Sequence, residues 1–250
     1  MGDDRDLGPR TTAAVARAAP TVLLVPLGST EQHGPHLPLD TDTRIAVAWA
    51  GAVAARLPGA VTAPAVAYGS AGEHQAFPGT LSIGQDALRA VVIELARSAA
   101  HLVDAVAYLS GHAGNTEPLA AAVTQLQAEG HRVDAVVPSW PADRWPPGTI
   151  DAHAGRTETS LLLHLDPTVV ALDQAEPGET APVGELLGAL RRHGLAGVTP
   201  NGVLGDPTGA SAGEGRRLFD DLVTRTVRRL GETIMDPKDL ARFQGVPPGC

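Results

Sequence analysis

The pattern of apolar and polar positions along the chain alternates between short apolar runs and longer amphipathic stretches. Apolar runs at 22–27, 61–66, 103–109 and 133–138 have the length and the flanking Gly or Pro residues that are typical of strands. Helical spacing predicts helices over 11–19, 43–57, 86–102, 157–165 and 216–234, and one that begins within 110–117 and runs to about 129. This order predicts an α/β fold, a three-layer sandwich with a mostly parallel sheet between helices.

Boundaries follow from the same pattern. We expect one domain over residues 1–250, with a core at about 22–235, a loose N-terminal lead-in and a loose C-terminal tail. Pro64 makes 61–66 an edge strand or a strand end, and Asp86 is expected to cap the helix over 86–102. Residues 172–190 fit neither pattern, and 202–215 is a glycine-rich loop.

Composition narrows the function classes. Apolar residues make up 43% of the chain and charged residues 19%, as in a globular protein. A net charge of −9 argues against nucleic-acid binding, which needs a basic face. No apolar run reaches membrane-span length, and the N-terminus does not resemble a signal peptide. The sole cysteine, Cys250, excludes an intrachain disulfide, so we expect a cytoplasmic protein.

Candidate chemistry is concentrated in one stretch, VPLGSTEQHGPHLPLDTDTR at 25–44. It follows the first predicted strand and packs five carboxylate and imidazole side chains into a segment rich in Gly and Pro: Glu31, His33, His36, Asp40 and Asp42. Because Pro35 and Pro38 prevent a helix, these side chains lie on a loop at the carboxyl end of a strand, where α/β sheets bind ligands. Carboxylates and imidazoles together indicate a site for zinc, manganese or iron(II).

Two later motifs lie where further site residues would be. His112, in GHAGN at 111–115, follows another predicted strand and is placed as a metal ligand would be, or as a residue that caps a turn. HAGRTETS at 153–160 places Glu158 at the start of a helix, where a carboxylate either binds a metal or caps the helix. His153, which opens the motif, titrates near neutrality when unperturbed and therefore suits a general acid or base.

Together these motifs resemble the creatininase family of metal-dependent amidohydrolases. The likeness covers roughly residues 22–230 and implies the creatininase α/β sandwich, with two divalent ions, Fe²⁺ or Zn²⁺ with Mn²⁺ also possible. It implies that Glu31, His33 and His112 are ligands and that Asp42 bridges the ions. Creatinine-hydrolysing members have a Glu ligand where this chain has Gly114, and we expect Glu158 to supply the missing fifth ligand.

The resemblance also implies roles around the ions. His153 would relay protons near the scissile bond, while a water shared by two ions would attack the carbonyl carbon. Four residues are expected to contact substrate: Glu73, His74, Asn115 and Trp140. Glu73 and His74 could equally be polar residues that only face solvent, and Asn115 could cap a helix. Asp206, in the late GDP loop, is a weaker candidate for a direct role.

The substrate expectation comes from finer likenesses. Creatinine-hydrolysing members have a second tryptophan where this chain has Thr149, which disfavours creatinine. GSTEQHGPHLPLDTDTRIA, HAGRTETSLLLHL and GVLGDPT are similar to a subfamily of peptidases that trim a radical-modified precursor peptide near its C-terminus. We therefore expect a modified peptide substrate, release of a short Val-Tyr-derived fragment, and a homo-oligomer. Two alternatives stay open: a creatinine or formamide-type amidohydrolase, and a non-catalytic metal-binding chaperone of a peptide-modifying complex.

Overall fold

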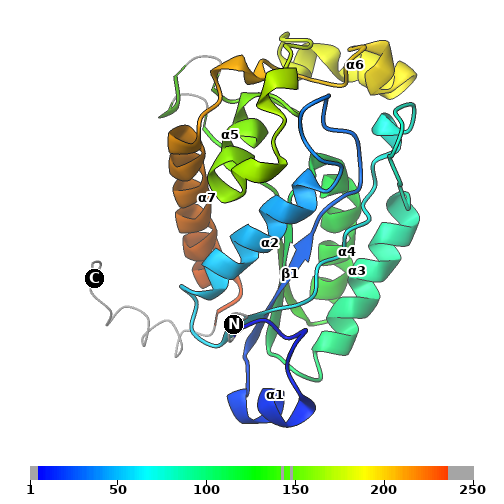
Figure 1. Ribbon diagram of the computed structural model, residues 1–250. Helices are drawn as coiled ribbons and strands as arrows, with labels where there is room; N and C mark the ends of the chain where they lie inside the picture. Colours follow the sequence, from blue (N-terminus) through cyan, green and yellow to red (C-terminus); the bar gives the residue numbers. More distant parts are fainter. Residues whose placement is uncertain (1–4, 142–143, 147–148, 236–250) are drawn as a thin grey trace.

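The computed structural model describes residues 5–141, 144–146 and 149–235, and its centre is a parallel sheet of four strands (Figure 1). In the order β2-β1-β3-β4, the sheet is formed by β1 (Val22–Leu27), β2 (Ala60–Thr62), β3 (Ala105–Ser110) and β4 (Arg132–Val136). Every pairing is parallel. The carboxyl ends of the strands therefore meet at one edge of the sheet, as the sequence predicts.

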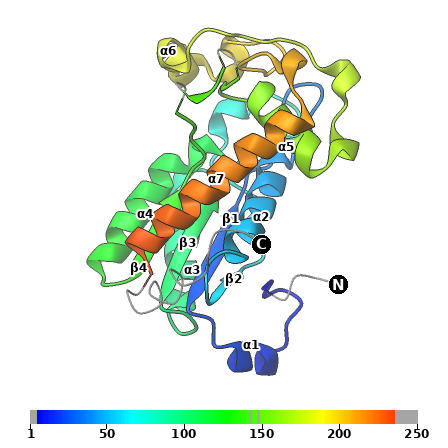
Figure 2. The same cartoon turned by 90° about the vertical axis from the view of Figure 1, so that its left-hand side faces the viewer.

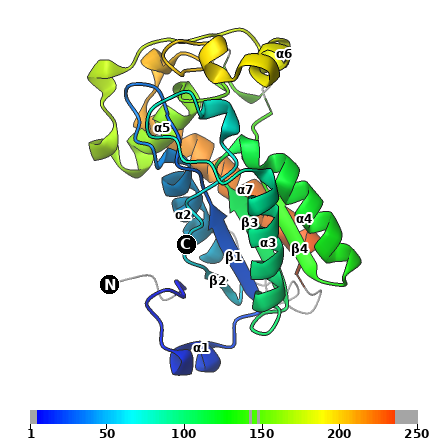
Figure 3. The ribbon, with the colours of Figure 1, turned by 90° about the vertical axis from the view of Figure 1, so that its right-hand side faces the viewer.

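Helices cover both faces of this sheet, which confirms the three-layer α/β prediction. Figures 2 and 3 show α3 (Gln85–Ala99) and α4 (Thr116–Ala128) on one face, and α2 (Thr41–Ala54) and α7 (Ala212–Thr233) on the other. Side chains of β1 alternate between the layers: Leu23 packs with α3 and α4, whereas Leu24 packs with α2, α5 (Arg156–Leu165) and α7. All six residues of β1 are buried, which explains its continuous apolar run.

Some boundaries differ from those expected. The strand predicted over 61–66 ends at Thr62, before Pro64, although it is an edge strand as expected. Asp86 does not cap α3, because Gly84 holds the N-cap position and Asp86 lies in the first turn. The N-terminal lead-in is not entirely loose: α1 (Thr12–Ala18) forms there, and the backbone of Leu7 donates to Thr62 of β2 at 2.9 Å.

The C-terminal half contains more helix than expected. The undecided stretch includes a 3₁₀ turn, η5 (Leu172–Gln174), and most of α6 (Val183–His193). The last helix, α7, begins at Ala212 rather than at 216, because Ser211 caps it by accepting a hydrogen bond from the backbone of Glu214 at 3.3 Å. None of the described helices is long and apolar enough to span a membrane. The predicted tail after 235 lies outside the described residues.

Candidate metal centre

The carboxyl edge of the sheet gathers all of the ligands that the sequence predicts. Glu31 and His33 lie on the loop after β1, and His112 follows β3 directly. Asp42 and Glu158 lie in the first turns of α2 and α5. Parallel strands bring these segments together although they are distant in sequence.

A glycine at the end of β3 permits this approach. A Cβ atom at Gly111 would lie 2.3 Å from the backbone oxygen of Asp42, which is far inside contact distance. The first turn of α2 can therefore pack against the end of β3 only if residue 111 has no side chain. This packing sets Asp42 beside His112, with 3.5 Å between Oδ2 and Nδ1.

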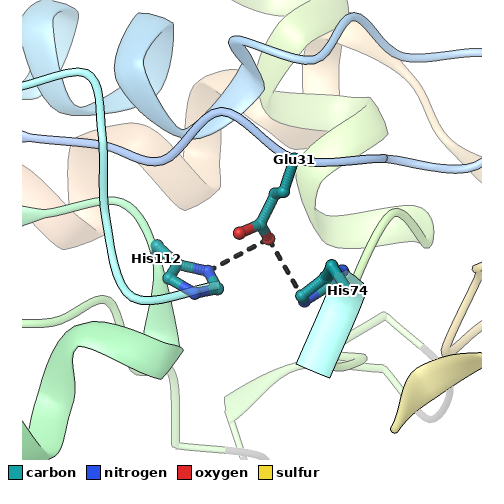
Figure 4. A group of neighbouring side chains, drawn as sticks. All are labelled: Glu31, His74 and His112. Atoms are coloured by element: carbon teal, nitrogen blue, oxygen red, sulfur yellow. Dashed lines mark ion pairs between the residues drawn. The ribbon is translucent and has the colours of Figure 1, made fainter. Parts of the chain in front are cut away.

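Glu31 is the centre of one half of the site. Its Oε1 lies 3.0 Å from Nδ1 of His112 and 3.3 Å from Nε2 of His74, the last residue of the short turn η1 (Gly72–His74) (Figure 4). Nδ1 of His153 lies 3.8 Å from the same oxygen. All four side chains are buried. One carboxylate oxygen is thus surrounded by three imidazoles.

Asp42 connects this half to a second one. Its Oδ1 lies 3.2 Å from Nε2 of His33, while its Oδ2 faces His112. Oε2 of Glu158 lies 3.8 Å from the same nitrogen of His33. The carboxylate of Asp42 therefore presents one oxygen to each half of the site, as a bridging ligand would.

Backbone carbonyls fix the orientation of three of these imidazoles. A carbonyl only accepts, so each ring must donate from the nitrogen that faces it. The contacts are those of His33 Nδ1 with Glu31 O at 3.1 Å, His112 Nε2 with Ser70 O at 3.1 Å, and His153 Nε2 with Gln32 O at 2.9 Å. The other nitrogen of each ring then faces the buried carboxylates. Histidines that bind metal show this arrangement, with one nitrogen held and the other free to coordinate.

The buried carboxylates need positive charge beside them to remain ionised. Burial and the neighbouring Asp42 raise the pKa of Glu31. Burial also disfavours ionised Asp42, but the facing His33 and His112 outweigh it and lower the pKa of Asp42. In return, and against their own burial, the carboxylates raise the pKa of His33 to about 10 and that of His112 to about 9. Protonated imidazoles here take the place that a divalent cation would fill.

Unsatisfied oxygens support the same conclusion. Both carboxylate oxygens of Glu31 and Oδ2 of Asp42 are buried without an aligned hydrogen-bond donor among the described residues. Buried polar atoms of this kind are rare, because each costs free energy unless it is paired. Carboxylate oxygens and imidazole nitrogens are ligands that zinc and manganese accept. The residues present therefore fit a divalent metal ion.

The surroundings of Gly114 leave no room for a larger side chain at this position. A Cβ atom at 114 would lie 2.3 Å from Nε2 of His112 and 2.5 Å from Oε1 of Glu73. The carboxylate of Glu73, at 38% exposure, thus takes up this space and faces His112 at 3.6 Å. Glu73 therefore lies at the metal centre, on the opposite side of His112 from Asp42.

Glu158 is placed where either of the roles that its sequence position allows is possible. Its Oε2 accepts a hydrogen bond from the backbone of Ala154 at 2.6 Å, which fixes the turn before α5. The same oxygen faces His33. Burial, opposed by His33, raises the pKa of Glu158 to about 7. Its role as the fifth ligand remains a prediction, and its distance to His33 is compatible with it.

The remaining predicted residues differ in their surroundings. Trp140 lines the cavity described below and donates to the backbone of Leu218 at 3.1 Å. Asn115 is fully buried, and its amide bonds the backbones of Gly28 and Ser70, so this geometry assigns it to the scaffold rather than to substrate. Asp206 accepts hydrogen bonds from Thr208 and caps a short turn; it does not line the cavity.

Gln32 is a site residue that the sequence did not single out. Its Oε1 accepts the backbone N–H of Gly34 at 2.9 Å, which fixes the direction of the amide. Its Nε2 then lies 3.1 Å from Nδ1 of His74, 3.0 Å from the backbone oxygen of Gly202 and 3.1 Å from Nε2 of His153. Because Nε2 of His153 already donates to the backbone oxygen of Gln32, the two amide hydrogens go to Gly202 and His74, and Nε2 of His74 is the nitrogen that carries the proton towards Glu31. Its position between two predicted ligands was the available signal.

A cavity of about 810 Å³ opens over this centre. Asp42, Glu73, His112, His153 and Glu158 form its polar floor. The late glycine-rich loop borders the same cavity: Leu204 lines it, and the backbone of Leu204 pairs with that of His153. Such a cavity, apolar with a few convergent polar groups, is typical of an enzyme active site.

Comparisons with known proteins agree with this geometry. Residues 9–230 match the family model of creatininase, described as creatinine amidohydrolase. The mycofactocin precursor peptide peptidase of Mycobacterium ulcerans (strain Agy99) is 51% identical over 240 residues, which cover 93% of each chain. A crystal structure of creatinine amidohydrolase matches 94% of this chain and 100% of its own, with a TM-score of 0.78 and 26% identity. The structure named creatininase Mn matches 93% and 99%, with a TM-score of 0.76 and 25% identity.

Proposed function

This chain belongs to the creatininase family and is a hydrolase of amide C–N bonds, and from that premise we propose that it is a peptidase that depends on divalent metal ions. Its proposed substrate is a radical-modified precursor peptide of the mycofactocin type, cut near the C-terminus to release a short Val-Tyr-derived fragment. The observation that carries the proposal is the cluster of buried carboxylates, several of whose oxygens lack a hydrogen-bond donor, beneath a cavity of about 810 Å³. The 51% identity with a peptidase of that name supports the substrate.

We assign two ions to the two halves of the site. Glu31, His112 and one oxygen of Asp42 would hold the first; His33, the other oxygen of Asp42 and Glu158 would hold the second. When bound, such ions supply a Lewis acid that activates water and polarises an amide carbonyl. Manganese, zinc and iron(II) all suit this donor set, and the relative named creatininase Mn favours manganese as the first ion to test.

His153 is the proposed proton carrier. Its Nε2 is held by the backbone oxygen of Gln32, so the free Nδ1 is the atom that can take up a proton. Burial and the neighbouring His33 lower the pKa of His153 well below its usual value, which keeps the ring neutral. Nδ1 would accept a proton from the attacking water and then pass it to the leaving nitrogen. Passing the proton on is favoured because the protonated ring is disfavoured by burial.

The cavity favours a peptide over creatinine. Trp140 is one aromatic wall, but Thr149, at the position of the second tryptophan, is buried and does not line the cavity. Glu73 is partly exposed on the floor and is available to accept an N–H group of the substrate. These residues leave room for an extended chain, whereas a small ring would have only one aromatic wall.

The test is incubation of the manganese-loaded protein with modified and unmodified precursor peptide, followed by mass spectrometry. We expect cleavage of the modified form near its C-terminus and little cleavage of the unmodified form. Equal cleavage of both would contradict the selectivity. Turnover of creatinine or of a formamide without peptide cleavage would favour the small-molecule reading, and metal binding with no turnover of any of these would favour the chaperone.

Assembly and location stay proposals. We propose a homo-oligomer on the likeness to creatininases, to be tested by light scattering. A cytoplasmic location is supported by the single cysteine of the chain, which cannot form an intrachain disulfide. Fractionation of cells that express the protein would test this location.

A further inference from the structure

Helix α6 (Val183–His193) has an apolar face without a protein core beneath it. None of its residues is fully buried, and Val183 and Leu187 are each 44% exposed. Val183, Leu187 and Leu190 recur at helical spacing and therefore share one face, while Glu185 and Arg192 are exposed. An amphipathic helix normally buries such a face against other elements of its own chain. Here another occupant has to be identified.

This face is a wall of the active-site cavity. Val183, Leu187 and Leu190 line the same cavity as Glu73 and His112, and they are joined there by Leu195, which is buried. Figure 1 shows α6 at the end of the molecule where the loops beyond the carboxyl edge of the sheet gather. The apolar face and the metal centre therefore look into one space, and a substrate at the centre would lie within reach of α6.

We propose that the α6 wall, defined as Val183, Leu187 and Leu190, binds a bulky apolar side chain of the substrate beside the scissile amide. The proposal rests on the proposed function, because it takes the substrate to be a peptide. Burying one such side chain against leucine and valine removes its apolar surface from water and therefore favours binding. A metal centre acts on amides in general, so selection among peptides has to come from surfaces such as this wall.

Charge recognition is the competing use of this helix. Arg191 also lines the cavity, and it is the only lysine or arginine among the lining residues that the structure describes. A guanidinium there would select an anionic group, whereas the wall selects an apolar one. The two uses make different predictions for variants of α6, and the experiment below separates them.

The experiment measures binding directly, by calorimetry, with two probes and the manganese-loaded protein. The probes are N-acetyl-valyl-tyrosine amide and N-acetyl-glycyl-glycine amide, which carry no charge and differ in their side chains. We expect the wild type to bind the first at least about tenfold more tightly, and Leu187→Ser and Val183→Ser each to lose most of that preference. The matched control is Leu95→Ser, because Leu95 is a leucine on α3 with 41% exposure that does not line the cavity.

Several outcomes would contradict the proposed role of the α6 wall in substrate binding. Leu187→Ser could keep the preference of the wild type, or Arg191→Met could lose it while Leu187→Ser keeps it. Leu187→Ser could also change the oligomeric state in light scattering without changing the preference, which would assign the face to a second copy of the chain. Cleavage of modified precursor peptide is assayed separately, so a wild type that prefers the valyl-tyrosine probe but cleaves no peptide would refute the proposed function alone.

Discussion

The imidazole of His153 is held by the backbone of Gln32: its Nε2 lies 2.9 Å from the carbonyl oxygen of that residue. The side chain of the same glutamine holds His74 through a contact of 3.1 Å to Nδ1. One residue thus sets which nitrogen carries the proton in two neighbouring rings. The two contacts differ in kind: a substitution of Gln32 removes the side-chain contact to His74 but leaves the backbone oxygen beside His153, although the amide nitrogen also lies 3.1 Å from Nε2 of His153.

This difference predicts the effect of Gln32→Glu. A carboxylate cannot donate to Nδ1 of His74, so that nitrogen must take the proton itself and present a bare Nε2 to Glu31. We expect turnover to fall about tenfold to a hundredfold, which corresponds to the roughly 1–3 kcal/mol of a lost buried hydrogen bond. Ring ¹⁵N shifts should show a change of tautomer for His74 but not for His153, whose Nε2 stays held by the backbone oxygen of Gln32 although the side chain lies 3.1 Å from it. Gln174→Glu, at an exposed glutamine, is the control, and unchanged His74 shifts would contradict the assignment.

Asp42→Ala should release both ions and abolish activity, because each half of the site loses one carboxylate oxygen. Elemental analysis after dialysis measures the loss. Asp40→Ala is a matched control: Asp40 is an exposed aspartate two residues earlier, and it pairs with Arg44 rather than with the site. Full metal occupancy in Asp42→Ala would show that the carboxylate does not bridge.

The substitution Glu158→Gln distinguishes a metal ligand from a helix cap more clearly than Glu158→Ala does. The amide keeps an oxygen that can accept from the backbone of Ala154, so the turn before α5 stays intact, but it loses the negative charge. If Glu158 binds a metal ion, metal content or turnover should fall strongly with little change in melting temperature. Retained metal and activity would leave the residue as a cap, whose loss in Glu158→Ala should cost about 1 kcal/mol of stability.

His153→Ala should leave both ions bound and slow turnover by roughly 10²- to 10⁴-fold, the usual contribution of general acid–base catalysis. Its Nδ1 is 3.8 Å from Glu31, so metal analysis of the variant is essential. Loss of one ion on this substitution would make His153 a ligand instead of a proton carrier.

The ion pair between Asp134 and Arg229 predicts a pH-dependent contribution to stability far from the site. Burial opposes ionisation of Asp134, but the bonds to Arg229 and Thr233 outweigh it and lower the pKa of Asp134. A lowered pKa in the folded state means that the carboxylate stabilises the fold above its ordinary pKa of about 3.9 and loses this effect as the pH falls. Asp134→Asn should therefore cost about 1 kcal/mol at pH 7, since Arg229 is half exposed, and less near pH 3.

Urea unfolding of Asp134→Asn at both pH values measures this difference. Asp220→Asn, at an exposed aspartate of the same helix α7, is the control. A cost that is equal at pH 7 and pH 3 would show that the substitution acts through packing and not through the charge.

The sequence predicted the layers and the ligand positions because each depends on local signals. The apolar runs that became β1 and β3, and the Gly- and Pro-rich loop that carries Glu31, His33 and Asp42, can be read in a short window. What the sequence does not reveal depends on contacts between distant segments. Asn115 was expected at substrate, but its amide is used by Gly28 and Ser70, and no local pattern reveals such partners.

α6 shows a different limit of sequence reading. Val183, Leu187 and Leu190 do recur with helical spacing, but the helix is short and lies between glycines and prolines, so the stretch 172–190, which contains most of it, stayed undecided. Its position over the cavity depends on the fold of the whole chain. The surroundings of Gly114 were equally hidden in the sequence, because the side chain of Glu73 that lies against this glycine belongs to another loop.

The spread of the ligands along the chain has a consequence for biosynthesis. Glu31 and Glu158 are more than a hundred positions apart, and two parallel crossovers separate Glu31 from His112. In a chain that emerges from the ribosome, Glu31 and His33 of the loop after β1 are present long before α5 is made. Such a chain cannot yet assemble the complete set of ligands. Non-local contacts of this kind form late in folding. Metallation should therefore follow translation, and a chelator added during synthesis should delay maturation without lowering the yield of folded chain.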